Sequence, residues 1–208
     1  MNMEELVSDL IKQGVLKDEK IINAFINISR KNFVLPEYKE EACSDYPLPT
    51  GYGQTISQPY IVALMTELLR PAPSDHVLEI GAGCGYQAAV LSVLVRKVTT
   101  IERIPAVADI ARNNLAAYHY DNVELIVGDG TLGYPKNAPY NGIIITASAP
   151  DIPSPLIDQL NENGRLVAPV GSRDIQELVV LEKHNDAITK ERHGGVRFVP
   201  LIGEYGWK

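Results

Sequence analysis

The chain has 208 residues, of which 45% are hydrophobic and 22% charged, and its formal net charge is −7. This length suits one α/β domain with a sizeable core, and the composition is ordinary for a globular protein in water. The acidic balance, without a basic cluster, argues against a nucleic-acid partner, because such proteins concentrate Lys and Arg on one face. No apolar run approaches the length of a membrane span, so we expect no membrane partner.

The two cysteines, Cys43 and Cys84, do not have the spacing of metal ligands, and the four histidines are scattered, so we expect no metal site. Residues 1–10 carry acids where a signal peptide has a basic region and an apolar core. Two cysteines are also compatible with a reducing compartment. We therefore expect a cytoplasmic protein, acting as a monomer.

Residues 1–45 are predicted to form a helical layer that packs on a sheet. One helix ends at Gly14, which can adopt a left-handed conformation, and a second begins after Asp18, which can cap it. Each helix has an apolar face, formed by Leu6, Val7, Leu10 and Ile11 in the first and by Ile21, Ile22, Phe25 and Ile26 in the second. These faces are interpreted as core.

Residues 46–59 are rich in Pro and Gly with aromatic and apolar residues between them, which predicts an ordered, irregular loop. Apolar residues then follow at helical spacing from Tyr60 to Leu68. On this local pattern Ser57 is an N-cap and Pro59 a first-turn proline of that helix.

The stretch from Val77 to Leu94 combines a short apolar run, a glycine turn and an amphipathic helix. It predicts the first βα unit of a parallel sheet, with a turn whose glycines let a ligand approach the backbone. The third glycine of a dinucleotide fingerprint is replaced by Tyr86. The pattern Glu-x-Gly-x-Gly-x-Gly instead resembles motif I of Rossmann-like S-adenosylmethionine (SAM) methyltransferases, although a tight turn without a ligand is an alternative interpretation.

Strands and helices alternate through the rest of the chain. Strands are predicted at Lys97–Glu102, Val123–Val127, Gly142–Thr146, Gly164–Ala168, Glu177–Glu182 and Val196–Leu201, and helices at Pro105–Leu115 and Leu156–Leu160. This alternation predicts a doubly wound, mostly parallel Rossmann-like sheet with late antiparallel strands. The order of the last two strands is left open by the residues.

Three acids fall at or near the ends of successive predicted strands: Glu79, Glu102 and Asp129. The carboxyl ends of parallel strands line the ligand crevice of such a sheet, and Glu102 has the spacing of a carboxylate that binds ribose hydroxyls. Acids suit a ligand with an ammonium group, a ribose diol and an adenine amine, and suit a phosphate-rich ligand poorly. This favours SAM over NAD.

Several segments together resemble the protein-L-isoaspartate (D-aspartate) O-methyltransferase family. They are, in chain order, residues 47–60 (PLPTGYGQTISQPY), 78–86, 128–130 with 138–140, 147–150, 164–171 and 196–201 (VRFVPL). The run Gly-Gln-Thr-Ile-Ser-x-Pro is much more specific than motif I. Departures from the family pattern include Thr131, where an aromatic residue is common, and Cys43 and Cys84.

The resemblance implies transfer of the SAM methyl group to the free carboxylate of L-isoaspartyl or D-aspartyl residues in damaged proteins, with S-adenosyl-L-homocysteine as product. It implies one domain over 1–208, with a helical layer (1–45), a substrate loop (46–59) and a Rossmann-like core (60–208). Ser57 is then expected to orient the acceptor carboxylate, Glu102 to bind the ribose, and Asp129 with Gly130 to contact adenine. The methionine part is assigned to Glu79, Gly81, Gly83 and Gly85, and the peptide cleft to Thr55, Ile56 and Val199.

This chemistry needs no general base, because a carboxyl group with a pKa of about 4 is already ionised at neutral pH. Positioning and exclusion of water are the main requirements. Two alternatives remain at this point: a SAM-dependent methyltransferase for another carboxylate or small molecule, and a binding module that recognises damaged peptides without catalysis. An NAD enzyme is a remote alternative.

Overall fold

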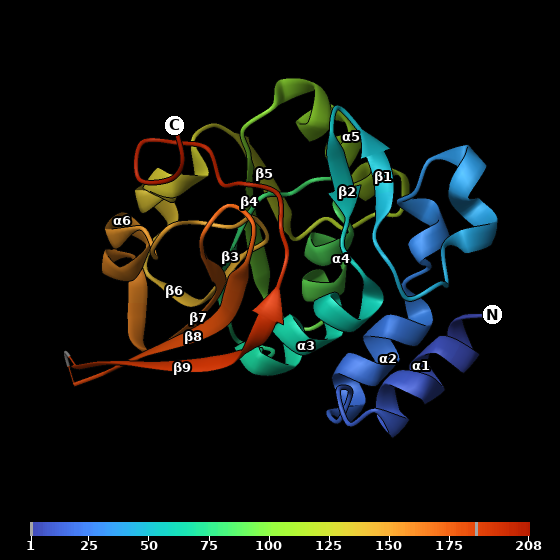
Figure 1. Ribbon diagram of the computed structural model, residues 1–208, viewed down its shortest axis with the longest axis horizontal. Coiled ribbons are helices and arrows are strands. Elements are labelled where there is room, and N and C mark those ends of the chain that lie inside the picture. Colours follow the sequence, from blue (N-terminus) through green and yellow to red (C-terminus); the bar gives the residue numbers. More distant parts are fainter. Residues whose placement is uncertain (1, 186) are drawn as a thin grey trace.

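The computed structural model describes residues 2–185 and 187–208 (Figure 1). Its centre is a seven-stranded sheet in the order β5-β4-β3-β6-β7-β8-β9. The strands from β5 to β7 are parallel, whereas β8 is antiparallel to β7 and β9 to β8. The doubly wound, mostly parallel sheet with late antiparallel strands is confirmed, and the last strands follow one another in chain order.

The elements of the sheet alternate with helices up to β7. The strands are β3 (His76–Ile80), β4 (Lys97–Glu102), β5 (Val123–Val127), β6 (Tyr140–Ile145), β7 (Leu160–Gly171), β8 (Gln176–His184) and β9 (Ala187–Val196). The helices are α3 (Pro59–Leu69), α4 (Tyr86–Ser92), α5 (Pro105–Ala117) and α6 (Ser154–Asp158), with short 3₁₀ turns at Gly130–Leu132 and Pro135–Asn137. Helix α6 begins two residues before the predicted start, between Pro153 and Pro155.

Two hydrophobic clusters cover the two faces of the sheet. One contains the side chains that α3, α4 and the N-terminal helices bury against Val77, Val98 and Ile144. The other packs α6 and the neighbouring turns against Leu78 and Ile143. Strands β3 and β6 are buried on both faces, as central parallel strands are.

The N-terminal layer consists of α1 (Met3–Lys12) and α2 (Glu19–Asn27), as predicted. Gly14 has the left-handed φ of 72°, and the side chain of Asp18 accepts a hydrogen bond from the N–H of Lys20. Two 3₁₀ turns, Arg30–Asn32 and Pro36–Glu41, connect this layer to the rest of the chain. In Figure 1 the layer lies beside α3, and its side chains belong to the same cluster as those of α3 and α4.

Residues 46–59 are more regular than predicted. They contain a hairpin of β1 (Leu48–Gly51) and β2 (Gln54–Ile56), paired antiparallel. Three successive residues at its tip, Gly51, Tyr52 and Gly53, have positive φ values of 94°, 51° and 71°. The two glycines allow this turn, so the expectation of an irregular loop was wrong.

The prediction of a strand at Val196–Leu201 was also wrong. The last strand is β9, which ends at Val196, and the chain then leaves the sheet and makes an isolated bridge between Ser148 and Pro200. Strand β9 is mostly exposed, with three charged residues near its centre, because it forms the edge of the sheet. It therefore lacks the alternation that marks a half-buried strand. Val199 and Leu201 instead pack with the second hydrophobic cluster, and Phe198 packs against the first.

Candidate functional site

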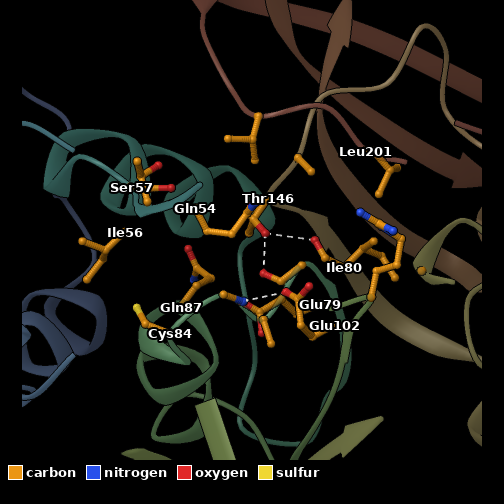
Figure 2. Close-up of a pocket in the computed structure, with 18 of the residues that line it drawn as sticks. Gln54, Ile56, Ser57, Glu79, Ile80, Cys84, Gln87, Glu102, Thr146 and Leu201 are labelled. Atoms are coloured by element: carbon orange, nitrogen blue, oxygen red, sulfur yellow. Dashed lines mark hydrogen bonds between the residues drawn. The ribbon is translucent and has the colours of Figure 1, made fainter. Parts of the chain in front are cut away.

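A cavity of about 210 Å³ opens at the carboxyl ends of β3, β4 and β6. Its walls come from the hairpin and the start of α3, the glycine loop after β3, the end of β4, and residues 199–202. All of the predicted site residues except Gly85 and Asp129 line it. In Figure 2, Glu79 and Glu102 lie together on one side of the view, and Ser57 and Ile56 on the other.

The glycine loop after β3 forms one side of the cavity, and two of its glycines have different roles. Gly81 has a φ of 97°, and a Cβ there would lie 2.5 Å from Oγ1 of Thr146, whose hydroxyl is 2.6 Å from the Gly81 carbonyl oxygen. Gly83 has a φ of 54°, and a Cβ built on it would meet no atom within 4 Å. Gly81 is therefore required for packing against β6, whereas Gly83 leaves backbone accessible to a ligand.

Gly85 lies outside the lining of the cavity. It is the left-handed N-cap of α4, with a φ of 90°. A Cβ there would lie 3.2 Å from Cγ of Leu115 on α5 and 3.5 Å from Ala111. Gly85 thus lies behind the loop, where it permits α4 and α5 to approach each other.

The carboxylate of Glu102 is oriented by the backbone. The N–H of Gly83 donates to Oε2 at 3.1 Å, and the N–H of Ile104 donates to Oε1 at 3.0 Å. Each oxygen keeps a lone pair for another donor. An acceptor fixed in this way at the end of β4 suits a ligand that presents hydroxyl groups.

Glu79 is fully buried, with one oxygen bound and one free. The hydroxyl of Thr100 donates to Oε2, and Oε1 has no hydrogen-bond partner in the described part of the chain. Burial, and to a smaller extent the charge of Glu102, raise the pKa of Glu79 to about 8 against the opposing hydrogen bond from Thr100. A buried acceptor without a partner at the wall of a cavity indicates a ligand that brings a donor or a positive charge.

Ser57 is not the N-cap of α3, so that local interpretation was wrong. The N-cap is Gln58, and the carboxylate of Asp45 accepts a hydrogen bond from the N–H of Tyr60 at 2.8 Å and another from Nε2 of Gln58 at 3.1 Å. Asp45 therefore caps the helix from a separate segment. The Ser57 hydroxyl has no hydrogen bond within residues 2–185 and 187–208, and it remains available at the cavity.

Arg30 fixes the backbone of Ser57, a role that sequence reasoning missed. Its side chain is fully buried, and its guanidinium donates to the carbonyl oxygens of Ala42, Tyr46 and Ser57 at 2.9, 3.1 and 3.0 Å. Burial lowers the pKa of Arg30. In the sequence Arg30 stands beside a second cation, Lys31, after a helix, and nothing in its surroundings signals burial.

Asp129 does not line the cavity. Its Oδ1 accepts hydrogen bonds from the N–H and the hydroxyl of Thr131 at 2.9 and 2.7 Å, and its Oδ2 accepts from the N–H of Glu204 at 2.7 Å. Burial alone would raise the pKa of Asp129, but these hydrogen bonds outweigh it and lower the pKa. The neighbouring Gly130 does line the cavity.

The two cysteines that depart from the family pattern are both buried and free. Cys84 lines the cavity, and burial raises the pKa of its thiol to about 11, so the thiol is neutral at physiological pH. Cys43 is buried beside the hairpin segment. Across the described residues no group of three or more potential metal ligands is present, and none of the helices is long and apolar enough to cross a membrane.

Comparisons with known proteins show the family of the chain. The family model described as Protein-L-isoaspartate(D-aspartate) O-methyltransferase (PCMT) matches residues 1–206. The chain is 58% identical to the protein-L-isoaspartate O-methyltransferase of Methanoregula boonei, over 93% of this chain and 89% of the relative. It is 50% identical to that of Methanopyrus kandleri, over 99% and 93%.

Solved structures give the same result. A protein-L-isoaspartate O-methyltransferase structure matches with a TM-score of 0.90 and 30% identity, over 99% of this chain and 67% of that one. The Plasmodium falciparum PCMT protein in complex with S-adenosyl-L-homocysteine matches with a TM-score of 0.84 and 26% identity, over 97% and 99%. The chain has the Rossmann-like fold of methyltransferases and belongs to the protein-L-isoaspartate (D-aspartate) O-methyltransferase family.

Proposed function

We propose that this protein transfers the methyl group of SAM to the free carboxylate of L-isoaspartyl, and also D-aspartyl, residues in damaged proteins and peptides. Family membership supports the activity. The observation that carries the proposal is one cavity with two chemically different ends. Buried or fixed carboxylates lie at one end, and a free serine hydroxyl at the start of a helix lies at the other.

The residues present fit SAM. The unpaired Oε1 of Glu79 and the open backbone at Gly83 would hold the methionine part, Glu102 would hold the ribose, and Gly130 would border the adenine. Gly85 and Asp129, which the sequence also suggested, lie outside the lining of the cavity and remain predictions from the sequence alone. When bound, SAM supplies an electrophilic methyl group on a sulfonium centre.

The chain's own residues orient the acceptor and exclude water. An acceptor carboxylate is already ionised at neutral pH, so no side chain has to remove a proton. The free hydroxyl of Ser57 would bind and orient this anion. Apolar walls from Ile56 and Val199 would limit solvation of the reacting charges.

A labelling experiment tests the proposal. The protein is incubated with methyl-labelled SAM and paired peptides that differ only in an aspartyl or isoaspartyl linkage. Base-labile label on the isoaspartyl peptide alone is the expected result. Binding of that peptide without label would instead indicate a recognition module, and SAM binding with neither peptide labelled would indicate another acceptor.

The role of Ser57 is tested in the same assay. Ser57→Ala should reduce methyl transfer about ten- to a thousandfold, because it removes a donor that orients the acceptor. Affinity for S-adenosyl-L-homocysteine, measured by isothermal titration calorimetry, should be unchanged. Loss of that affinity together with turnover would contradict the assignment.

We further infer that the protein works as a cytoplasmic monomer, without nucleic acid or metal.

A further inference from the structure

Residues 203–207, here called the clamp, form a turn that docks on the loop after β5. The N–H of Glu204 donates to Oδ2 of Asp129 at 2.7 Å, and the N–H of Tyr205 donates to Oγ1 of Thr131 at 3.1 Å. The Thr131 hydroxyl in turn donates to Oδ1 of Asp129 at 2.7 Å. Thr131, a departure from the family pattern, is thus a fully buried link between the clamp and the Asp129–Thr131 loop.

The other end of the clamp is bound to Leu201 and Ser148. The N–H of Trp207 donates to the carbonyl of Leu201 at 2.8 Å, and its indole N–H donates to the carbonyl of Ser148 at 3.0 Å. Ser148 also accepts from the N–H of Leu201 at 2.8 Å. Arg173 lies over the Trp207 ring, 5.1 Å from its centroid. The clamp and Ser148 together therefore fix the segment that carries Val199 to Ile202.

The packing of the clamp leaves no space for an added methyl group. A Cβ on Gly203 would lie 2.1 Å from Oδ1 of Asp129 and 2.7 Å from Cγ2 of Thr131. A Cβ on Gly206 would lie 2.3 Å from the carbonyl oxygen of Leu201. The clamp thus contacts both segments closely, and displacement of one transmits to the other.

These two segments border different parts of the proposed site. Gly130, between the two side chains that bind the clamp, lines the cavity on the side assigned to the cofactor. Val199 lines it and is assigned to the acceptor, and the next lining residues of that segment include Leu201, which lies near Ile80 in Figure 2. In Figure 1 the red C-terminal segment runs from β9 to a loop at the C-terminus.

We propose that the clamp couples the two halves of the site, so that cofactor binding at the Asp129–Thr131 loop orders the acceptor wall at residues 199–202. Asp129 and Thr131 are positioning residues in this coupling, which rests on the proposed function for its assignment of the two walls. The acceptor peptide then meets a wall that is held more firmly when the cofactor is present.

Amide hydrogen exchange tests the coupling without requiring turnover. In the wild type, saturating S-adenosyl-L-homocysteine should slow exchange in the segment 199–202 by at least about fivefold, the lower end of measured couplings between sites. Thr131→Val removes the hydroxyl at nearly constant volume, and Gly203→Ala introduces a clash with Asp129. Both variants should bind the ligand at saturation yet lose this slowing, and Thr131→Ser, which keeps the hydroxyl, should restore it.

Gly195→Ala is the matched control, because a Cβ there meets only one atom, 4.0 Å away. It should keep the full wild-type response. Equal slowing in the wild type, Thr131→Val and Gly203→Ala would overturn the coupling, as would no slowing in the wild type with ligand bound. The labelling experiment separates the two proposals: methyl transfer with no coupling contradicts only the clamp, whereas failure of the wild type to bind S-adenosyl-L-homocysteine contradicts both.

Discussion

The two glutamates of the cavity, Glu79 and Glu102, have the same side chain but different hydrogen-bond partners and different surroundings. Glu102 is an acceptor fixed by two backbone N–H groups at the end of a strand. Glu79, one strand away, is enclosed by the sheet and has a single donor, Thr100. Hydrogen bonds from the backbone favour a carboxylate, whereas burial disfavours it. The sequence shows both as acids near strand ends, but cannot show this difference.

Protonation of Glu79 should make stability depend on pH. The pKa of Glu79 is about 8 in the folded protein, against 4.5 for a glutamate exposed to water. Between these two pH values the folded state therefore binds more protons than the unfolded state. The free energy of unfolding should therefore fall as pH rises through this window. In Glu79→Gln the free energy of unfolding should change less steeply with pH.

Thermal melts of the wild type and Glu79→Gln between pH 5 and pH 8, spanning about that window, measure the effect. Glu37→Gln, at an exposed glutamate, is the control and should keep the wild-type slope. An unchanged slope in Glu79→Gln would show that Glu79 is ionised in the folded protein.

Loss of the Glu102 carboxylate should weaken cofactor binding. Hydrogen bonds to charged groups contribute about 1.5–3 kcal/mol, so Glu102→Ala should raise the Kd for S-adenosyl-L-homocysteine about tenfold or more. Isothermal titration calorimetry provides the measurement. A Kd equal to that of the wild type would exclude Glu102 from the cofactor site.

At the scale of single elements, helix α3 shows what a local pattern can and cannot predict. Pro59 was predicted correctly as a first-turn residue, because its fixed φ suits that position. The cap was assigned to Ser57, the nearest residue of a suitable type, but Asp45 supplies it from a different part of the chain. Nothing in a local sequence window reports such a contact. The same limit explains β9, whose exposed edge position removes the apolar pattern of a strand.

Asp45→Ala should therefore affect both stability and the acceptor site. Loss of a helix cap costs about 0.5–2 kcal/mol, which urea denaturation can measure. Because Asp45 also holds the start of α3 next to Ser57, KM for an isoaspartyl peptide should rise.

Asp18→Ala, which removes the cap of α2, is the matched control. It should lower stability by a similar amount and leave KM unchanged. Equal changes in KM for the two variants would mean that Asp45 acts on stability alone.

At the scale of the whole molecule, the N-terminal layer and the sheet share one hydrophobic cluster. Phe33, beyond the two helices, packs edge-on against Tyr86 of α4, with ring centroids 5.4 Å apart. The sequence predicts both the layer and the sheet from their periodicity, but not the contact between them. This shared core supports the prediction that residues 1–208 form one domain.

One domain should unfold in one step. Phe33→Ala should lower the free energy of unfolding by about 3–5 kcal/mol, the usual cost of removing a buried ring. The loss should appear equally in far-UV circular dichroism and in the fluorescence of Trp207, the single tryptophan, which lies in the clamp. Two transitions that do not coincide would show that the layer and the sheet unfold separately.

Strand β9 leaves one border of the sheet with unpaired backbone groups, the kind of border along which separate molecules can join by adding strand to strand. Its central residues are Lys190, Glu191, Arg192 and His193, and Lys190 and Arg192 pair with Asp151 and Glu177. A second molecule approaching this border would have to strip water from these charges and place like charges opposite each other. The same charges that concealed β9 from sequence prediction thus disfavour edge-to-edge pairing of folded molecules.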